Sequence, residues 1–316
     1  MGKKAFKFLK WILVIVVLAL IAFSIYISDQ VAQGVSQLSD PKETKENSMN
    51  FLKSVNFDYE QFAKDYPIEI KNLQSTYEDH QIPVAHIKTK KSSSQGAVIM
   101  IHGLGGTKES VLPICQYFLD LGYDVYSYDQ RNCGDNTART NSFGFFESKD
   151  LNDVVDEVAQ GLNPEHKLVV WGESFGGATA GIGSKAIEDK VDYLILDSPM
   201  SDGQVMTKSE MASIEKETGL PASYMTLVGD WNLRLLSKYS LEDTKVVNYI
   251  KDVKTPLLVF HSKDDQVIPF SMGQEIYEAS AASDKEFVTV DQGEHVMLFF
   301  ENPDLYKQAI KDFLKP

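Results

Sequence analysis

The chain has 316 residues, 43% of them hydrophobic, which is enough for one large α/β domain or two ordinary domains. Its formal net charge is −14, and because residues 1–28 contain four lysines and no acid, the remainder is more acidic still. Such a surface excludes nucleic acid as an expected partner. Cys115 and Cys133 are too few for a disulfide framework and lack metal-ligand spacing, so we expect free thiols, or at most one bridge, and no metal site.

The N-terminus is basic and is followed by seventeen uncharged residues, Trp11 to Ile27. This length is at the lower limit for a transmembrane helix. All four lysines precede the apolar run, so the positive-inside rule predicts cytoplasmic residues 1–10 and an extracytoplasmic chain after Ser28. We interpret residues 1–28 as a signal anchor, and a cleaved signal peptide that yields a secreted protein is the alternative.

Residues 29–50 are polar and lack a strong apolar period, as is typical of a stalk. The folded domain is therefore expected to cover residues 51–316. Apolar residues at roughly helical intervals predict a helix over residues 51–66, covering the first strands.

Strands and helices are then predicted to alternate. Alternating side chains over 68–77 and 82–89 predict an antiparallel hairpin at a sheet edge. The apolar run 97–101 is typical of a central parallel strand. Further strands are predicted at 124–128, directly before Ser174, and at 191–196, 257–261 and 286–290. Helices are predicted at 108–121, 148–162, behind Ser174, at 271–281 with Ser271 and Gln274 as a capping box, and after Asn302 and Pro303. The pattern predicts one doubly wound, mostly parallel α/β sheet.

The segment Gly172-Glu173-Ser174-Phe175-Gly176 matches G-x-S-x-G at a predicted strand-to-helix turn. A turn this sharp forces the serine into a strained backbone conformation, and the two glycines avoid a collision. The strain pushes the Ser174 hydroxyl towards solvent, at the positive end of the next helix. A merely structural turn is the alternative, but the flanking apolar strand and small residues favour a nucleophile.

A serine nucleophile needs a base, and the base needs an orienting acid. Of six histidines, only His295 lies in a loop after the last predicted strand, at the same sheet edge as Ser174. Asp264 and Asp265 follow the penultimate strand, and Asp197 follows the sixth. The order serine, aspartate, histidine is the one that a nucleophile-elbow fold requires.

The negative oxygen formed on attack needs hydrogen-bond donors. One candidate is the backbone N–H of Phe175, directly after the nucleophile. The other is the N–H of Leu104, in the glycine-rich loop His102–Gly106. His102 itself is expected to be a packed residue that fixes this loop.

These motifs resemble the α/β-hydrolase superfamily, in the broad group that includes Bem46-like, serine-aminopeptidase-like and dienelactone-hydrolase-like proteins. The resemblance covers residues 68–316. The matching positions are His102-Gly103 with Gly105-Gly106, Asp129–Gly134, Gly172–Gly176, Asp265 and His295.

The resemblance implies an α/β-hydrolase fold with Ser174, Asp265 and His295 as the triad. Asp265 is preferred because this superfamily's acid commonly stands four residues before a proline, here Pro269; in some relatives the acid follows the sixth strand, where Asp197 stands. The family often has D-x-R-G-x-G where this chain has Asn132 in place of glycine. Arg131 in that loop could hold a substrate carboxylate or form an ion pair with a local aspartate.

The alternation stops from Met200 to about Thr244, which predicts a helical cap inserted after strand six and lying over the active site. The segment contains four of the nine methionines. Methionines make adaptable apolar surface, so Met200, Met206, Met225 and Trp231 are candidate substrate contacts. Ordinary packing of the cap is the alternative.

The sequence thus predicts an extracytoplasmic serine hydrolase held in the membrane by its N-terminal helix. It would be a carboxylesterase for small to medium acyl esters that needs no metal or organic cofactor. A peptidase or amidase with the same triad is the alternative, in which Glu173 or an acid in the cap would hold a free amino terminus. A binding module without activity is a third possibility, against which the complete triad argues.

Overall fold

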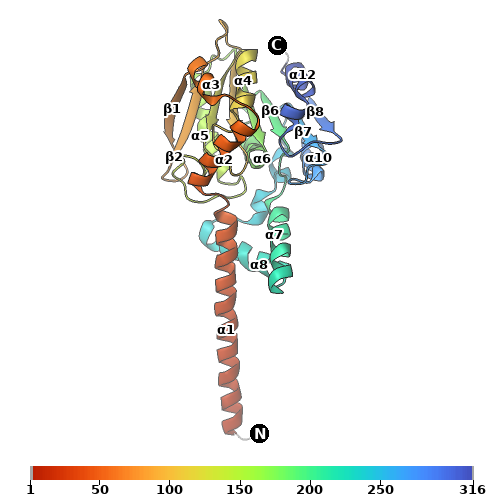
Figure 1. Cartoon of the computed structure of the whole chain (residues 1–316). Coiled ribbons are helices and arrows are strands. Elements are labelled where there is room, and N and C mark those ends of the chain that lie inside the picture. The colour runs from red at the N-terminus through yellow and green to blue at the C-terminus, as the bar shows by residue number, and fades with distance from the viewer. Residues whose placement is uncertain (1–2, 315–316) are drawn as a thin grey trace. The chain divides into compact units, whose positions relative to one another are not determined.

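The computed structural model of the chain describes residues 3–314 and divides into two units. One unit contains the residues up to Ser36 together with Gln204–Asp243, and we call it the anchor-cap unit. The other contains Gln37–Gly203 and the residues from Thr244 onward, and we call it the sheet unit. Figure 1 shows the elements of both, many of them labelled.

The sheet unit is organised around an eight-stranded sheet of order β1-β2-β4-β3-β5-β6-β7-β8. The hairpin of β1 and β2 is antiparallel, β2 is antiparallel to β4, and the other neighbours are parallel. This confirms the predicted edge hairpin and mostly parallel sheet. The strands are β1 (Ile68–Gln74), β2 (Gln81–Ile87), β3 (Gly96–Ile101), β4 (Tyr123–Tyr128), β5 (Lys167–Glu173), β6 (Tyr193–Asp197), β7 (Leu257–Ser262) and β8 (Lys285–Val290).

Central strands are apolar on both sides because helices cover both faces of a doubly wound sheet. Every residue of β3 and of β7 is buried. On one face, Phe260 stacks on Tyr306 with ring centroids 3.9 Å apart. The Tyr306 hydroxyl accepts from Trp171 Nε1 at 3.0 Å and donates to Asp197 at 2.8 Å. Through these buried contacts of Tyr306, the last helix packs against β5, β6 and β7 near their carboxyl ends.

The helices of the sheet unit follow most predictions. The last one begins at Pro303 after Asn302, as expected. The capping box predicted at Ser271 is wrong, because that helix begins at Phe270 after Pro269 and has no side-chain cap among the described residues. The helices are α2 (Pro41–Ser54), α3 (Tyr59–Asp65), α4 (Leu112–Leu121), α5 (Glu147–Gly161), α6 (Phe175–Ile187), α9 (Val247–Ile250), α10 (Phe270–Ala279), α11 (Leu298–Glu301) and α12 (Pro303–Phe313).

The segment predicted to be a stalk is mostly helical. Helix α1 (Lys3–Ser36) continues past the apolar run, and α2 starts at Pro41. The Asp40 side chain accepts from the N–H groups of Lys42 and Glu43 at 2.8 and 3.1 Å, so an N-cap followed by proline starts α2. The single helix predicted over 51–66 is divided into α2 and α3 near Asn56, where φ is 55°. The predicted stalk residues from Gln37 onward therefore belong to the sheet unit.

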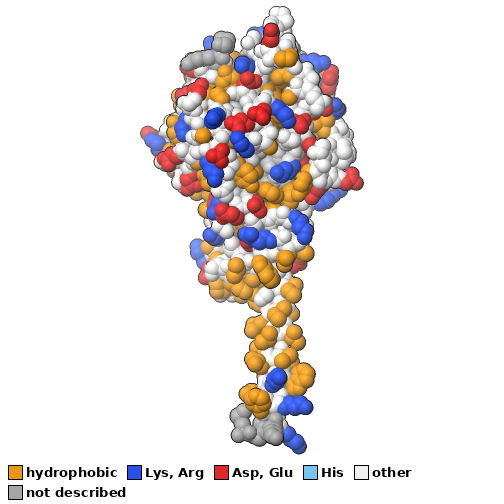
Figure 2. All heavy atoms as spheres, turned by 180° about the vertical axis from the view of Figure 1, so that it is seen from behind, with side chains coloured by type: hydrophobic (Ala, Val, Ile, Leu, Met, Phe, Trp, Pro, Cys, Tyr) orange, Lys and Arg blue, Asp and Glu red, His pale blue; other side chains and the backbone are white. Residues whose placement is uncertain are grey.

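The anchor-cap unit contains α1 and the helices of the predicted insertion after β6. These are α7 (Gly203–Thr218), α8 (Ala222–Asn232), the π-helical turn η1 (Leu233–Ser237) and the 3₁₀ turn η2 (Leu241–Thr244). Helix α1 contains an apolar stretch, with a mean hydropathy of 2.7, that is long enough to cross a membrane. Hydrophobic side chains cover α1 in Figure 2. Within this unit, α8 packs against the C-terminal part of α1.

Candidate active site

Ser174 lies at the turn between β5 and α6 with φ 51° and ψ −115°, a region that a residue with a side chain rarely adopts. The turn is possible because its neighbours are glycines. A Cβ at Gly172 would lie 2.5 Å from the Gly176 carbonyl oxygen, and one at Gly176 would lie 2.3 Å from the Ile101 oxygen. The sequence therefore forces the serine out at the end of a strand, as the motif predicted.

The structure brings the three predicted triad residues together. The Ser174 hydroxyl lies 2.8 Å from Nε2 of His295, and Nδ1 of His295 lies 2.6 Å from Oδ2 of Asp265. The serine follows β5, the aspartate follows β7 and the histidine follows β8, so parallel strands deliver all three to one edge. With Nδ1–H donating to the carboxylate, Nε2 is free to accept the serine proton.

Asp265 is held as an anion by its surroundings. Burial alone would raise its pKa, but hydrogen bonds from His261 and His295 and the charge of His295 hold the pKa well below its usual range. Its other oxygen accepts from the N–H groups of Val267 and Ile268 at 2.8 and 2.9 Å. Both carboxylate oxygens thus accept hydrogen bonds, and these hold the Asp265 side chain in place against His295.

The two other candidate acids are placed differently. Asp264 is exposed. Asp197 is fully buried and accepts hydrogen bonds from the hydroxyls of Tyr306 and Ser198 at 2.8 and 3.0 Å. Burial raises its pKa. The geometry thus favours Asp265 as the partner of His295.

A cavity of about 210 Å³ lies beside Ser174 and His295. Leu104 and its neighbouring glycines line one side, so the predicted oxyanion loop and the nucleophile face the same space. Phe175 is the first residue of α6, where backbone N–H groups have no acceptor within the helix. Both candidate donors therefore belong to elements that reach the serine hydroxyl.

His102 fixes the candidate oxyanion loop, as predicted. Its side chain is fully buried, Nδ1 lies 2.7 Å from the Gly103 oxygen, and Nε2 accepts from the Gln130 N–H at 3.0 Å. Burial lowers its pKa, so it stays neutral. Both of its ring nitrogens are used in backbone hydrogen bonds.

Glu173 also lines the cavity. Its Oε1 accepts from the Gly103 N–H at 3.1 Å and so connects the elbow to the oxyanion loop. Burial, reinforced by the charge of Asp197, raises its pKa to about 8 despite that hydrogen bond. At neutral pH this carboxyl group is mostly protonated.

One wall of the cavity was missed by the sequence reading. Asn47, Ser48 and Phe51 of α2 line it, and the first two lie within residues 29–50, the predicted stalk. The Ser48 hydroxyl accepts from Thr107 at 2.9 Å, which holds α2 beside the loop. The signal that could have found this helix is Asp40-Pro41, an N-cap followed by proline.

The four predicted substrate contacts are not among the residues lining this cavity. Met200 is 3% exposed and follows β6. Met225 packs with Val31 and Met211 in the anchor-cap unit, because its side chain faces α1. Trp231 is 68% exposed, and Met206 is partly buried in α7. Methionine content alone gave no information on which face of a cap helix each side chain occupies.

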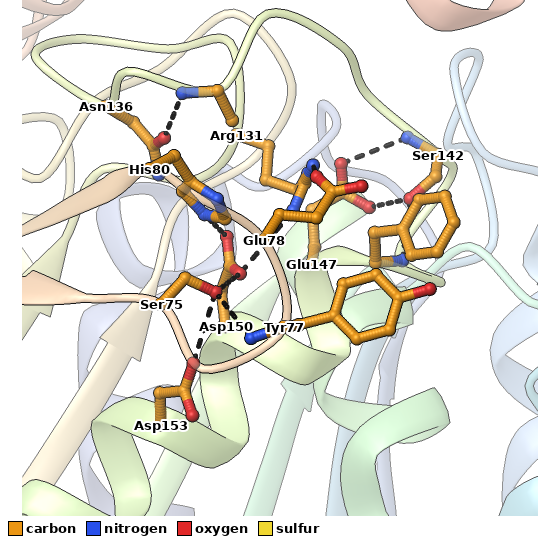
Figure 3. A network of polar contacts seen from close by, with 12 residues as sticks. Ser75, Tyr77, Glu78, His80, Arg131, Asn136, Ser142, Glu147, Asp150 and Asp153 are labelled. Carbon is orange, nitrogen blue, oxygen red and sulfur yellow. Dashed lines mark hydrogen bonds and ion pairs between the residues drawn. The ribbon is translucent and has the colours of Figure 1, made fainter. Parts of the chain in front are cut away.

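Arg131 forms an ion pair, which was the alternative to binding a substrate carboxylate. It is 2% exposed, contacts Glu78, and its Nη1 lies 3.6 Å from Asp150. Asp150 also accepts from His80 at 2.9 Å. Figure 3 shows this network, in which the guanidinium points between carboxylates contributed by α5 and the turn after β1. These ion pairs indicate that Arg131 stabilises the loop and does not bind substrate.

Asn132 explains how this loop tolerates the absence of the usual glycine. Its φ is 56°, in the left-handed region that glycine adopts freely and asparagine better than most residues. Its side-chain amide donates to the Ser39 carbonyl at 2.6 Å and to Asn141 at 3.2 Å. The loop keeps a glycine-like backbone and gains two hydrogen bonds.

Comparison with known proteins identifies two matching family models. One, described as alpha/beta hydrolase fold, matches residues 96–217, and the other, described as serine aminopeptidase S33, matches residues 232–303. The YqkD protein of Bacillus subtilis is 31% identical over 220 residues, covering 69% of this chain and 70% of that protein.

Two further similarities involve proteins with a named activity. Lysophosphatidylserine lipase ABHD12 of Xenopus tropicalis is 28% identical over 241 residues, covering 71% of this chain and 58% of that protein. The structure of the Pyrococcus furiosus esterase Pf2001 has a TM-score of 0.62 at 21% identity, covering 80% of this chain and 94% of that one. At that identity the structural likeness reports a shared fold.

Proposed function

The chain belongs to the α/β-hydrolase superfamily, and from this membership and the geometry at Ser174 we propose that it is a serine carboxylesterase acting on small to medium acyl esters. The observation that carries the proposal is the hydrogen-bonded series Asp265, His295, Ser174 beside a cavity. Nothing in folding requires a strained serine, a histidine and a buried anion to be aligned in this way.

The proposed reaction follows from these positions. Ser174 Oγ attacks the ester carbonyl while Nε2 of His295 takes its proton, and Asp265 stabilises the imidazolium. The N–H groups of Phe175 and Leu104 hold the oxyanion. His295 then returns the proton to the leaving alcohol, and an acyl-enzyme on Ser174 forms. Water activated by His295 releases the acid and restores the serine.

We also propose that α1 anchors the enzyme in a membrane with the catalytic unit outside the cytoplasm. The support is the apolar, exposed helix and the lysines that precede it. Charged residues first reappear at Asp29, after the apolar run.

A peptidase or amidase is the second candidate, because a serine aminopeptidase model matches residues 232–303. An exopeptidase needs an anion for the substrate ammonium. Glu173 is the carboxyl group nearest the nucleophile in sequence, but its pKa of about 8 and its hydrogen bond to Gly103 make it a weak partner for a cation at neutral pH. This favours the ester.

The test is a hydrolysis screen of the full chain in detergent micelles. The substrates are p-nitrophenyl esters of two to twelve carbons, a lysophosphatidylserine because of the lipase relatives, and aminoacyl anilides. We expect turnover of esters that falls to the background rate in Ser174→Ala. Unchanged ester turnover in that variant would refute the nucleophile, and hydrolysis of anilides without esters would favour the peptidase.

A further inference from the structure

Four large apolar side chains of α8 and η1 are exposed. Leu227 is 67%, Trp231 68%, Leu235 56% and Leu236 72% exposed. The first three are spaced four residues apart, so they lie along one helical face. We call these four residues the cap apolar face.

The opposite side of α8 is already buried against α1. Met225 packs with Val31, and a Cβ at Gly229 would lie 2.3 Å from Cγ1 of Val31, so the two helices approach closely. Hence α8 is apolar on its packed side and on its outward side. A contiguous apolar face that is exposed to this extent normally marks a site of contact with protein or lipid.

Charges on this segment are few. Between Ala222 and Ser237 the only charged residues are Asp230 and Arg234, which form an ion pair at 2.8 Å. Lys238 follows directly and donates to the Leu235 carbonyl at 2.7 Å. The segment therefore presents little net charge, and this does not favour a charged protein partner.

The contacts of α8 locate it at one level of α1. Ser24 of α1 lies 2.8 Å from the Tyr224 hydroxyl, and Asn232 donates to Ser28 at 3.3 Å. These positions are at the end of the uncharged run from Trp11 to Ile27. Trp11 and Tyr26, 61% and 60% exposed, mark its two ends with the aromatic residues that favour membrane interfaces.

The length of the uncharged run indicates the depth of α8 in the membrane. At about 1.5 Å per residue its seventeen residues span roughly 26 Å, less than the hydrocarbon core of about 30 Å. The turn of α1 that bonds α8 thus falls at the depth of the outer headgroup boundary. An apolar helix bound there continues the apolar surface of the anchor.

We propose that the cap apolar face lies in the outer interface of the same phospholipid bilayer that holds α1. The proposal rests on the membrane anchor of the proposed function. Trp231 and the three leucines insert between headgroups, and α1, α8 and η1 together form the membrane-bound part of the anchor-cap unit. Because the segment has little net charge, the contact does not require anionic lipid.

The test uses the full chain in phosphatidylcholine vesicles, with single cysteines carrying a nitroxide at Leu227, Trp231 or Leu236. Cys115 and Cys133 are 0% and 2% exposed, so they contribute little labelling. Ser213→Cys is the matched control, because Ser213 is exposed on α7 of the same unit. Leu18→Cys, at the middle of the apolar run, reports the anchor.

We expect the three face positions and Leu18→Cys to favour collision with oxygen over a water-soluble nickel complex, several-fold more than Ser213→Cys does. The proposal would be overturned if the label at Leu18→Cys favoured oxygen while the labels on the cap apolar face were as accessible to the nickel complex as the label at Ser213→Cys. That result would still support α1 as a membrane anchor. An aqueous signal at Leu18→Cys would refute the anchor, and with it the inserted face.

A label-free measurement guards against disturbance by the nitroxide. In Trp11→Phe the remaining tryptophans are the exposed Trp231 and the fully buried Trp171. Brominated phosphatidylcholine should quench the Trp231 part of the fluorescence, and the quenching should disappear in Trp11→Phe/Trp231→Phe. Equal quenching of the two proteins would contradict the proposal.

Discussion

At the scale of single residues, two buried aspartates at the carboxyl ends of adjacent strands differ in their hydrogen-bond partners. Asp265 contacts His295, whereas Asp197 contacts Tyr306 and Ser198. Sequence order alone left both as candidates for the acid. The choice depended on a resemblance to the pattern of a superfamily, because spacing along the chain does not say where a side chain points.

Exchange of each aspartate for asparagine tests this assignment. Asp265→Asn should lower kcat about 10³- to 10⁴-fold. The amide oxygen stays with the N–H groups of Val267 and Ile268, so the NH2 group faces Nδ1 of His295 as a donor and imposes the wrong histidine tautomer. Asp197→Asn is the matched control, and its folded fraction should keep kcat within a few-fold. The measurement is ester turnover corrected for active-site concentration. A larger loss in Asp197→Asn would reverse the assignment.

The raised pKa of Glu173 predicts how the free energy of unfolding depends on pH. Its folded pKa of about 8 is above the usual value of 4.5, so the folded state keeps a proton that the unfolded chain releases. This group therefore makes the free energy of unfolding fall as pH rises from about 4.5 to 8. In Glu173→Gln the decrease between pH 5 and pH 8.5 should be smaller, as measured by urea unfolding. An unchanged slope would mean that Glu173 is ionised in the folded protein.

At the scale of elements, the strands were predictable because a doubly wound sheet leaves continuous apolar runs in the sequence. The elbow was equally predictable, since its geometry requires glycine at two fixed positions. The α1–α2 boundary was not found, because the polar faces of both helices hide the apolar period that marks a buried helix. Only the N-cap Asp40, with Pro41 after it, marks the start of α2.

Alanine substitution tests the steric requirement of the elbow. Gly176→Ala places a Cβ 2.3 Å from the backbone oxygen of Ile101, which cannot move without disturbing β3. We expect a loss of several kcal/mol in the free energy of unfolding. Gly161→Ala is the control, because nothing lies within 4 Å of its added Cβ at the end of α5. It should be neutral or slightly stabilising, by about 1 kcal/mol at most. Equal effects would contradict the steric argument.

At the scale of the whole molecule, the order of motifs predicts the fold and the three proposed triad residues, but it does not predict the residues lining the cavity. Residues 41–54, far from the elbow in sequence, form one wall of the cavity. The four substrate contacts predicted in the insertion do not line the cavity. Composition alone does not show which face of a helix each of these side chains occupies. Pocket lining depends on tertiary packing, which a local pattern does not encode.

Two truncations that both lack α1 measure the contribution of α2. The fragment 51–316 loses the hydrogen bonds of Ser48 with Thr107 and of Thr44 with Gly134, and leaves Leu52 in a frayed end. Relative to 37–316 it should be less stable by roughly 3 kcal/mol and have a several-fold higher KM. Urea unfolding and ester kinetics measure both. Identical behaviour would mean that α2 is dispensable to the site.

The most direct test of the central claim is labelling of the full chain, in detergent micelles, with a fluorophosphonate followed by peptide mapping. We predict modification of Ser174, a rate at least about 10³-fold lower in His295→Ala, and no modification in Ser174→Ala. A folded protein that does not react, or that reacts at another residue, would contradict the assignment of Ser174 as an activated nucleophile.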